Sequence, residues 1–435
     1  MTLNIKFKST LLGQIWYLFG LGYCFTVAST AIAKPQLEAA LPPLEAVQQS
    51  LVEHPNVRAA ISEQDYADFA RQGLKVGQNP WTVTAGMQVR KTDTQLERKQ
   101  ANSYEPSLGI EKQIRLPNKY RLDQDLAQRI SSIAELKYEN AQHQASKMLL
   151  NSWFAYMRST LHLKRLQEQL DQIQQFIQVT EQRIRAGDAP RLELMLLKNE
   201  YQQLEEQYIQ AKAAYIQAQQ LLARDYRGKI PEQWSSDVIQ PSPIQYSQAE
   251  WVQKILSVNH ELALVRMQAT QQYAVLKREQ LNRLPDPTIG FGYSREQSGE
   301  ENLLGVSVSI PLTARQVGIA SGMAAAEAKK ADLEVLRVEK RLRQEIQGWV
   351  IQMESATVRN TKAQENLQLL QQQHHLMQKA YKLGELNLNE LLLHSQQLIE
   401  ARSRVDQAKV DYAESMSSLL LDSHQLWPLH EMDRI

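Results

Sequence analysis

Two long helical stretches, each broken at a single glycine, constrain the fold more than any other feature. Residues 122–185 contain neither Gly nor Pro, and they run into the segment Arg183 to Leu197, RIRAGDAPRLELMLL. A second long stretch runs into Lys379 to Leu393, KAYKLGELNLNELLL. Because Gly lets a helix end in a left-handed turn at little cost, each segment predicts the tip of a helical hairpin. Two matched tips in one chain indicate an internal duplication.

The order of elements around the tips supports two repeats, 34–247 and 248–435. In the first repeat we expect a helix over 44–78 interrupted at His54-Pro55, strands at about 82–90 and 107–115 separated by a polar segment, a long helix, a tip at 186–190 and a return helix. Residues 227–247 contain Gly and three prolines and predict an equatorial linker. The second repeat has a helix over 248–282, strands at about 288–295 and 303–310, a tip at 383–388, a return helix over 388–422 and a C-terminal tail.

Apolar positions within the long helices alternate in steps of three and four, the seam of a coiled coil. A helix of about 60 residues is roughly 90 Å long, far longer than a globular core requires. The seam positions are Leu163, Leu166, Leu170, Ile173, Ile177, Thr180 and Ile184 in the first half and Leu367, Leu370, His374, Met377 and Tyr381 in the second.

The N-terminus has the features of a secretory signal peptide, with cleavage predicted after residue 33. Lys6 and Lys8 precede an apolar run, and Ala31-Ile32-Ala33 is a small-x-small site. A single membrane anchor is the alternative. The only cysteine, Cys24, follows Tyr23 rather than a small residue, so we do not expect a lipidated N-terminus. The mature chain then has no cysteine and no thiol chemistry.

Charge and motifs exclude several function classes. The net charge is +1, without the basic stripe of a nucleic-acid-binding protein. The sequence has no P-loop, Rossmann glycine pattern or nucleophile elbow, and no metal-ligand spacing. We therefore expect no enzyme, no cofactor and no metal site. Adjacent His374 and His375 do not face each other on a helix, and His374 falls on the seam, which favours packing.

The strands predict a membrane surface. Each is about the length of a tilted membrane strand and alternates apolar with polar residues. Four strands are too few to enclose a passage, and open sheet edges are not tolerated in lipid. Three chains would supply twelve strands, enough for an aqueous lumen, and would gather the helices into a tube. An ordinary soluble hairpin and a plain coiled-coil scaffold are the alternatives for the strands and the heptads.

The duplicated plan, the paired glycine tips and the strand pairs before long helices resemble the TolC family of outer-membrane efflux proteins over nearly the whole mature chain. The stretches Leu108 to Ile114 and Gly305 to Leu312, with Arg315 to Gly318, are similar to the heavy-metal RND efflux (CzcC-like) branch. The resemblance implies mostly α structure with membrane β, a homotrimer with a 12-stranded β-barrel and an α-helical tunnel. It also implies a periplasmic adaptor, an inner-membrane pump of RND type, and the outer membrane of a Gram-negative bacterium.

The resemblance also suggests functional positions at the tips. In the family an apolar residue often follows the tip Gly, whereas both positions are acidic here. An acid six residues beyond the second Gly faces the tunnel mouth in the family, and three copies would attract cations; the family's second acid is a leucine here. The adaptor-contact candidates are Ala186, Gly187, Asp188, Leu383, Gly384 and Glu385, and the tunnel-gate candidates are Glu390, Leu393 and Glu193. A solvated helix-end carboxylate is the alternative for both glutamates.

These observations predict a passive exit duct in a tripartite efflux system, with divalent metal cations as the expected cargo. A duct of the same fold for type I protein secretion is one alternative. A periplasmic coiled-coil adaptor or scaffold that conducts nothing is another, although such a protein should carry one hairpin inside a β-rich domain rather than two hairpins that each follow paired strands.

Overall fold

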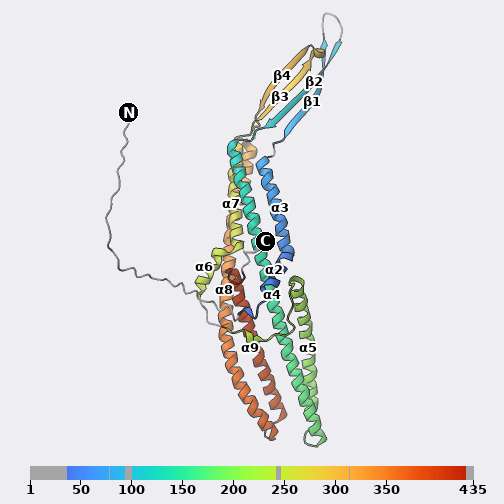
Figure 1. Cartoon of the computed structure of the whole chain (residues 1–435), viewed down its shortest axis with the longest axis vertical. Coiled ribbons are helices and arrows are strands. Elements are labelled where there is room, and N and C mark those ends of the chain that lie inside the picture. Colours follow the sequence, from blue (N-terminus) through green and yellow to red (C-terminus); the bar gives the residue numbers. More distant parts are fainter. Residues whose placement is uncertain (1–36, 78, 94–99, 242–245, 313, 428–435) are drawn as a thin grey trace, which may run out of the picture.

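A computed structural model describes residues 37–77, 79–93, 100–241, 246–312 and 314–427 of the chain. The predicted signal peptide, Cys24, part of the linker and the end of the tail lie outside the described residues. The molecule is elongated, with a β-sheet at one end, two helical hairpin tips at the other and a thicker waist between them (Figure 1).

The two halves of the chain have the same order of elements with nearly the same lengths. The first half contains α2 (Leu44–Glu53), α3 (Pro55–Val76), β1 (Trp81–Asp93), β2 (Gln100–Gln113), α4 (Pro117–Arg185) and α5 (Arg191–Asp225). The second contains α6 (Gln248–Val258), α7 (His260–Gln280), β3 (Thr288–Glu296), β4 (Glu301–Ser309), α8 (Ala314–Lys382) and α9 (Leu388–Asp422). Helices α4 and α8 each have 69 residues, and α5 and α9 each have 35.

Local sequence explains where the helices begin. The His54 imidazole accepts a hydrogen bond from the backbone N–H of Asn56, and Pro55 follows in the first turn of α3, where its missing N–H does no harm. Asn259 caps α7 in the same way through the N–H of Leu262. Pro117 occupies the first turn of α4, so this helix starts five residues before the stretch 122–185 that contains neither Gly nor Pro.

The helices form one curved layer, and different helices make up this layer on the two sides of the waist. Between the sheet and the waist, α4 packs against α3 on one side and α7 on the other, and α7 packs against α8. Between the waist and the tips, α4 packs against α5 and α9, and α9 packs against α8 (Figure 1). Helix α8 therefore forms one edge of the layer along its whole length, while α3 and then α5 form the other.

The main hydrophobic core lies at the waist, where α2, α6 and the linker cover the long helices. Trp153 on α4 is 1% exposed, and its indole N–H donates a 2.9 Å hydrogen bond to the carbonyl of Ala40. Its ring meets those of Tyr226 and Trp234 edge to face. Aromatic burial of this kind stabilises the waist strongly, because each ring removes a large apolar area from water.

The predicted heptad seam of the first hairpin is confirmed. Leu166, Leu170 and Ile173 are buried in a cluster with Leu197 and Leu204 of α5, between the waist and the tip. In the second half the seam positions of α8 are half-buried, and most other positions of α8 between residues 361 and 381 are exposed.

The four strands form an antiparallel sheet in the order β1-β2-β3-β4. The prediction that residues 91–106 form a polar segment between the first two strands is largely wrong. β1 continues to Asp93 and β2 begins at Gln100, with Lys91 opposite Asn102 and Met87 opposite Pro106. A hairpin ladder depends on backbone hydrogen bonds, so it continues beyond the residues whose side chains alternate in polarity. β3 ends one residue after its predicted range, and β4 begins two residues before and ends one residue before its predicted range.

Within the described residues, no helix combines the length and the apolar character that crossing a membrane would require.

Candidate functional site: the sheet faces and the hairpin tips

One face of the sheet is apolar across all four strands. Residues directly opposite each other in an antiparallel sheet point to the same face, so the register defines rows. The rows on this face are Trp81, Lys112, Ile289 and Val308; Val83, Ile110, Phe291 and Val306; and Ala85, Leu108, Tyr293 and Leu304. Eleven of these twelve positions are apolar or aromatic, so the period-2 pattern of each strand combines into one continuous surface.

Nothing in the described chain covers this apolar face. Val83 is 70% exposed, Val306 70% and Leu304 88%. The sheet extends beyond the helices, which end at its base (Figure 1). A soluble antiparallel sheet packs one face on a core, and monomeric proteins rarely expose apolar patches larger than a few hundred Å². The face therefore requires an apolar partner from outside the chain.

The opposite face carries small and polar residues. One row consists of Thr84, Gly109, Gly292 and Gly305, and the next of Gly86, Ser107, Ser294 and Leu303. A Cβ on Gly305 would meet no atom within 4 Å, and one on Gly109 or Gly292 would meet atoms only at 3.8 Å or more, so crowding does not explain the glycines of the first row. Glycine within strands permits the bending that a closed sheet requires.

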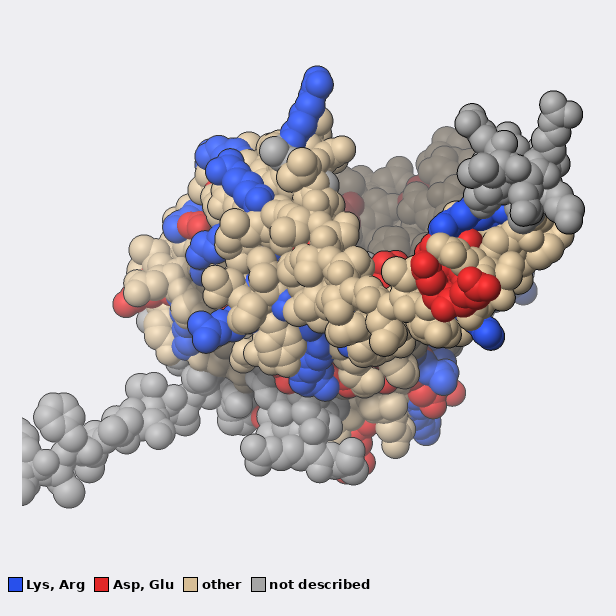
Figure 2. Space-filling model, turned by 90° about the horizontal axis from the view of Figure 1, so that it is seen from above, with Lys and Arg blue, Asp and Glu red and all other residues tan. Residues whose placement is uncertain are grey.

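The far end of the polar face carries an ion-pair group. The guanidinium of Arg90 pairs with Glu105 at 3.0 Å and with Glu296. Viewed from the sheet end, acidic side chains gather here with basic ones beside them (Figure 2).

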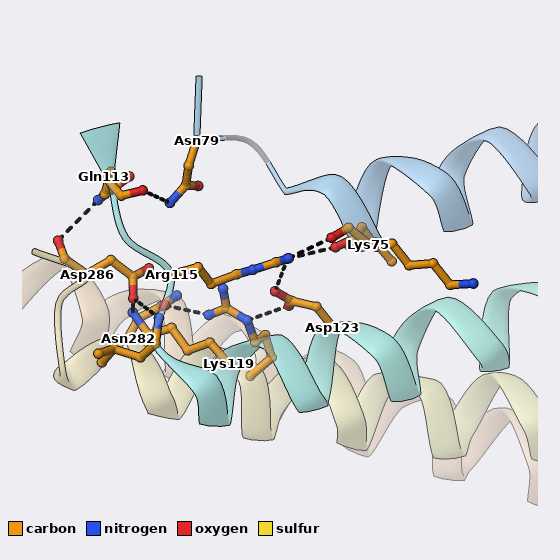
Figure 3. A network of polar contacts seen from close by, with 11 residues as sticks. Lys75, Asn79, Gln113, Arg115, Lys119, Asp123, Asn282 and Asp286 are labelled. Atoms are coloured by element: carbon orange, nitrogen blue, oxygen red, sulfur yellow. Dashed lines mark hydrogen bonds and ion pairs between the residues drawn. The ribbon is translucent and has the colours of Figure 1, made fainter. Parts of the chain in front are cut away.

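A buried polar network joins the base of the sheet to the helices (Figure 3). Arg115, just after β2, donates to Asp123 of α4 at 2.9 Å and to the carbonyls of Leu74 and Lys75 at the end of α3 at 2.7 and 2.8 Å. Asp123 is 5% exposed and accepts a second bond, of 2.6 Å, from Arg278 of α7.

A second carboxylate completes this network. Asp286 accepts bonds from the N–H of Leu116 at 3.0 Å and from Lys119, whose Nζ lies 3.2 Å away and which is 3% exposed. Three helices and three strand connections thus meet in one set of charge-assisted hydrogen bonds, which fixes the sheet relative to the tube. No local pattern in the sequence indicates this network, since Asp123 and Arg278 are 155 positions apart.

Both predicted tips turn at the predicted glycines with the same geometry. Gly187 has φ +79° and Gly384 has φ +76°. At each tip the glycine N–H bonds to the carbonyl three residues earlier, and the next N–H bonds to the carbonyl five residues earlier. This pair of bonds is the Schellman arrangement, which satisfies carbonyls at a helix end. A Cβ at either glycine would meet nothing within 4 Å, so only the backbone conformation requires Gly.

The acids at the two tips have different surroundings. Asp188 is an ion-pair partner of Arg183 at 3.3 Å, and Glu193 lies 4.0 Å from the same guanidinium with its side chain 24% exposed. Glu385 and Glu390 are exposed at the second tip. The backbone N–H of Glu390 is capped by the Asn387 side chain at 2.9 Å. Glu193 and Glu390, which occupy equivalent positions in the two halves, therefore have different surroundings.

The remaining candidate positions lie on the outer surface of the tips. Leu383 is 75% exposed and Leu393 is 58% exposed, while Ala186 is the C-cap residue that follows α4. Gly187 lies between α4 and α5 and Gly384 lies between α8 and α9, so the two glycines belong to separate hairpins. The roles assigned to these residues remain predictions.

A contact between the hairpins was missed by sequence reasoning. Arg183 Nη1 donates a 2.9 Å hydrogen bond to the Tyr381 hydroxyl, and the guanidinium lies 5.6 Å from the centre of the tyrosine ring. Further from the tips, Gln396 of α9 donates to Glu200 of α5 at 2.6 Å. These bonds join α4–α5 to α8–α9 just above the turns. The sequence contains no pattern that indicates which of these residues form pairs.

His374 and His394 of the second hairpin are half-buried, whereas His375 is exposed. His374 Nε2 lies 2.9 Å from Gln378, and His394 Nε2 lies 3.1 Å from Gln373. Burial and the neighbouring His394 lower the pKa of His374. Across the part of the chain that is described, no group of three or more His, Cys, Asp or Glu residues is arranged to hold a metal ion.

Both edges of the helical layer are apolar and open. On one side, Tyr66, Phe69 and Val76 of α3 are 68%, 72% and 84% exposed, and β1 ends the sheet. On the other, α8 carries an exposed stripe and β4 is the edge strand. The stripe consists of Leu333, Ile351, Val358, Leu369 and Leu376, which share one helical face.

No protein-family model matches the chain, and no curated protein is similar to it in sequence. The fold, however, is shared with crystal structures of outer-membrane channels. It is similar to CusC, described in terms of folding and transmembrane channel formation, with a TM-score of 0.71, 13% identity, and coverage of 90% of this chain and 92% of that one. It is similar to the outer membrane protein VceC of Vibrio cholerae, with a TM-score of 0.70, 15% identity, and coverage of 89% of this chain and 96% of that one. It is also similar to the CmeC outer membrane channel of Campylobacter jejuni, with a TM-score of 0.64, 14% identity, and coverage of 90% of this chain and 85% of that one.

Proposed function

We propose that this chain is one subunit of an outer-membrane exit duct. The uncovered apolar face of the sheet is the main support for the proposal, because lipid tails can cover an apolar surface of this kind. The face spans rows from Trp81 to Val89 on β1, about the height that a tilted membrane strand covers. The likeness to outer-membrane channels at nearly full length supports the same assignment.

Three copies would close the duct as a homotrimer. β1 and α3 lie on one side of the chain and β4 and α8 on the other, so a head-to-tail contact repeats around a ring. Such a contact pairs the two edge strands and buries both apolar helix edges. Three copies supply twelve strands, a barrel wide enough for water, with the glycine-rich face inside. We attribute the matching halves of each chain to an internal duplication.

The tips would bind a periplasmic adaptor that connects the duct to an inner-membrane pump of RND type. Exposed Leu383 and the turns at Gly187 and Gly384 form the end of the tube furthest from the sheet. The Arg183–Tyr381 bond holds the two hairpins together there, so its rupture would widen the entrance. The duct itself is passive, since the pump supplies the energy.

We propose divalent metal cations as the cargo. The stretches Leu108 to Ile114 and Gly305 to Leu312 support this choice through their resemblance to the heavy-metal branch. Exposed Glu390 would form a ring of three carboxylates in the trimer, which attracts cations.

The proposal is tested in two steps. First, the membrane fraction is washed with high salt and with urea; a duct stays with the outer membrane, whereas a scaffold washes off. Second, a deletion strain is grown against divalent metals and hydrophobic drugs, with complementation by the gene. Sensitivity to metals alone supports metal export. Sensitivity to drugs alone refutes the metal assignment and retains the duct, and a washed-off protein refutes the duct.

A further inference from the structure

One lysine interrupts the apolar face of the sheet. Lys112 of β2 lies between Trp81 of β1 and Ile289 of β3, in the row nearest the helices, and is the one charged residue in the three rows described above. Its Nζ lies 4.8 Å from the centroid of the Trp81 ring, a cation–π distance. Among the residues that the structure describes, no carboxylate pairs with this ammonium group. An anion from outside the chain could therefore pair with it.

An open groove begins beside this lysine. It has a volume of about 940 Å³ and lies where α3 ends, β1 begins, β2 ends and α4 begins. Its walls are mostly apolar and aromatic, and they include Val76, Pro80, Trp81, Ile114 and Tyr120. Ligand sites in proteins have volumes of this order, with apolar walls and a few polar groups that fix the orientation of the ligand.

Only one of the two cations that line the groove is available to a ligand. The second cation, Arg115, donates hydrogen bonds to Asp123 and to the carbonyls at the end of α3, and its guanidinium lies 4.7 Å from the centre of the Tyr120 ring. Asn79 Nδ2 donates a 3.2 Å bond to the carbonyl of Gln113, which ties the start of β1 to the end of β2 (Figure 3). The groove is thus braced by its own bonds, and Lys112 supplies its free charge.

The groove lies at the level where the apolar face of the sheet ends. The rows of Val83 and Ala85 lie further from the helices, and beyond the row of Trp81 the strands pass into their connections with α3 and α4. In a bilayer, the lipid phosphates lie just outside the hydrocarbon core, at the depth where Trp and Lys side chains gather. The position of Lys112 therefore matches that of a phosphate group.

We propose that this groove binds the phosphate group of an anionic phospholipid, with Lys112 as its counter-charge. The inference rests on the proposed membrane location of the sheet. The Lys112 ammonium donates to the phosphate while the Trp81 ring supports it, and the acyl chains continue along the apolar rows of the sheet. A zwitterionic phospholipid binds less tightly, because its own cationic group competes with Lys112 for the phosphate.

A neighbouring copy of the chain is the competing occupant. In the proposed ring, β4 of one subunit lies next to β1 of another, and Leu312, just after β4, is 95% exposed. An inserted leucine would exclude lipid from the groove. The charge favours lipid over leucine, since an aliphatic side chain would leave the Lys112 ammonium beside an apolar group without an anion.

Native mass spectrometry of the purified full-length protein in detergent tests the proposal, with phosphatidylglycerol and phosphatidylcholine titrated separately. We expect one phosphatidylglycerol per subunit, bound more tightly than phosphatidylcholine. Lys112→Met should weaken phosphatidylglycerol binding about tenfold, as the loss of one charge-assisted hydrogen bond predicts, and Lys112→Arg should retain it. The control Lys362→Met removes the same charge from α8, where the side chain is 71% exposed and paired with Glu365, and should bind as wild type.

Three outcomes would overturn the proposal. The first is equal affinity of wild type and Lys112→Met for phosphatidylglycerol, and the second is an equal loss of affinity in Lys362→Met. The third is tighter lipid binding after Leu312→Ser without an effect of Lys112→Met, which would assign the groove to the neighbouring copy. The membrane wash keeps the two proposals apart. A protein that washes off refutes the duct, whereas one that stays in the membrane and binds lipid independently of Lys112 refutes this inference alone.

Discussion

Adjacent leucines on β4 provide the sharpest test of where the sheet resides. Leu304 points to the apolar face and is 88% exposed, whereas Leu303 points to the polar face and is 45% exposed. The same Leu→Arg substitution can therefore be made on both faces at the same height. If the sheet were soluble, Leu304→Arg should be harmless, because changes at exposed surface positions alter stability by about 0.5 kcal/mol or less. Leu303→Arg should then be the more damaging change.

A membrane location reverses this order. Arginine on a lipid-facing strand near the bilayer midplane costs about 2–4 kcal/mol, and a lumen-facing arginine costs little. In a trimer the lipid-facing change would act three times, for a total of about 6–12 kcal/mol. We expect Leu304→Arg to lower the urea midpoint of the protein folded into lipid vesicles strongly, and Leu303→Arg to leave it near wild type.

The assay measures the folded fraction against urea concentration in vesicles, with the trimer band on unheated gels as a second readout. Equal midpoints for the two variants, or a lower midpoint for Leu303→Arg, would refute the assignment of the apolar face to lipid.

Four further predictions follow from other parts of the molecule. Tyr381→Phe removes the hydrogen bond between the hairpins, so the reconstituted channel should conduct more in planar bilayers; unchanged conductance would show that this bond does not restrict the entrance. Gly384→Ala places a Cβ at φ +76°, and calorimetry should show a loss of about 1–2 kcal/mol without a packing defect. Asp123→Asn removes the buried carboxylate charge that Arg115 and Arg278 share and should destabilise by about 3–5 kcal/mol in urea, whereas the control Asp125→Asn, in an exposed pair, should lose less than about 1 kcal/mol. The depressed pKa of Asp422 stabilises the fold above about pH 4, so exchange protection of the end of α9 should fall on acidification below that value, and fall less in Asp422→Asn.

Local periodicity accounts for what sequence reasoning predicted well. The seam of Leu166, Leu170 and Ile173 was readable because each position lies within one or two helical turns of the next. The alternation of apolar and polar residues in β1 predicted its apolar face for the same reason, since side chains in a strand point to the same face every two residues. The tip glycines were readable because a left-handed turn restricts the residue type at a single position.

The strand ends and the paired side chains could not be read in this way. The outer half of the β1–β2 hairpin continues through Pro106 because the backbone ladder does not require alternating side chains. The Arg183–Tyr381 bond joins residues 198 positions apart, and it exists because the helices leading to each tip match in length. A shift of one residue in either helix would turn the side chain by about 100° and break the contact.

The sequence by itself thus determined the elements of this protein: two long hairpins with glycine turns, four alternating strands and a chain without catalytic motifs. Only the tertiary structure decided which apolar surface remains uncovered, how Asp123 and Asp286 fix the sheet to the helices, and that Arg183 meets Tyr381 between the hairpins. The physical reason is that periodicity over a few residues specifies helix and strand, whereas contacts between distant segments depend on the summed lengths and rotations of all the elements between them.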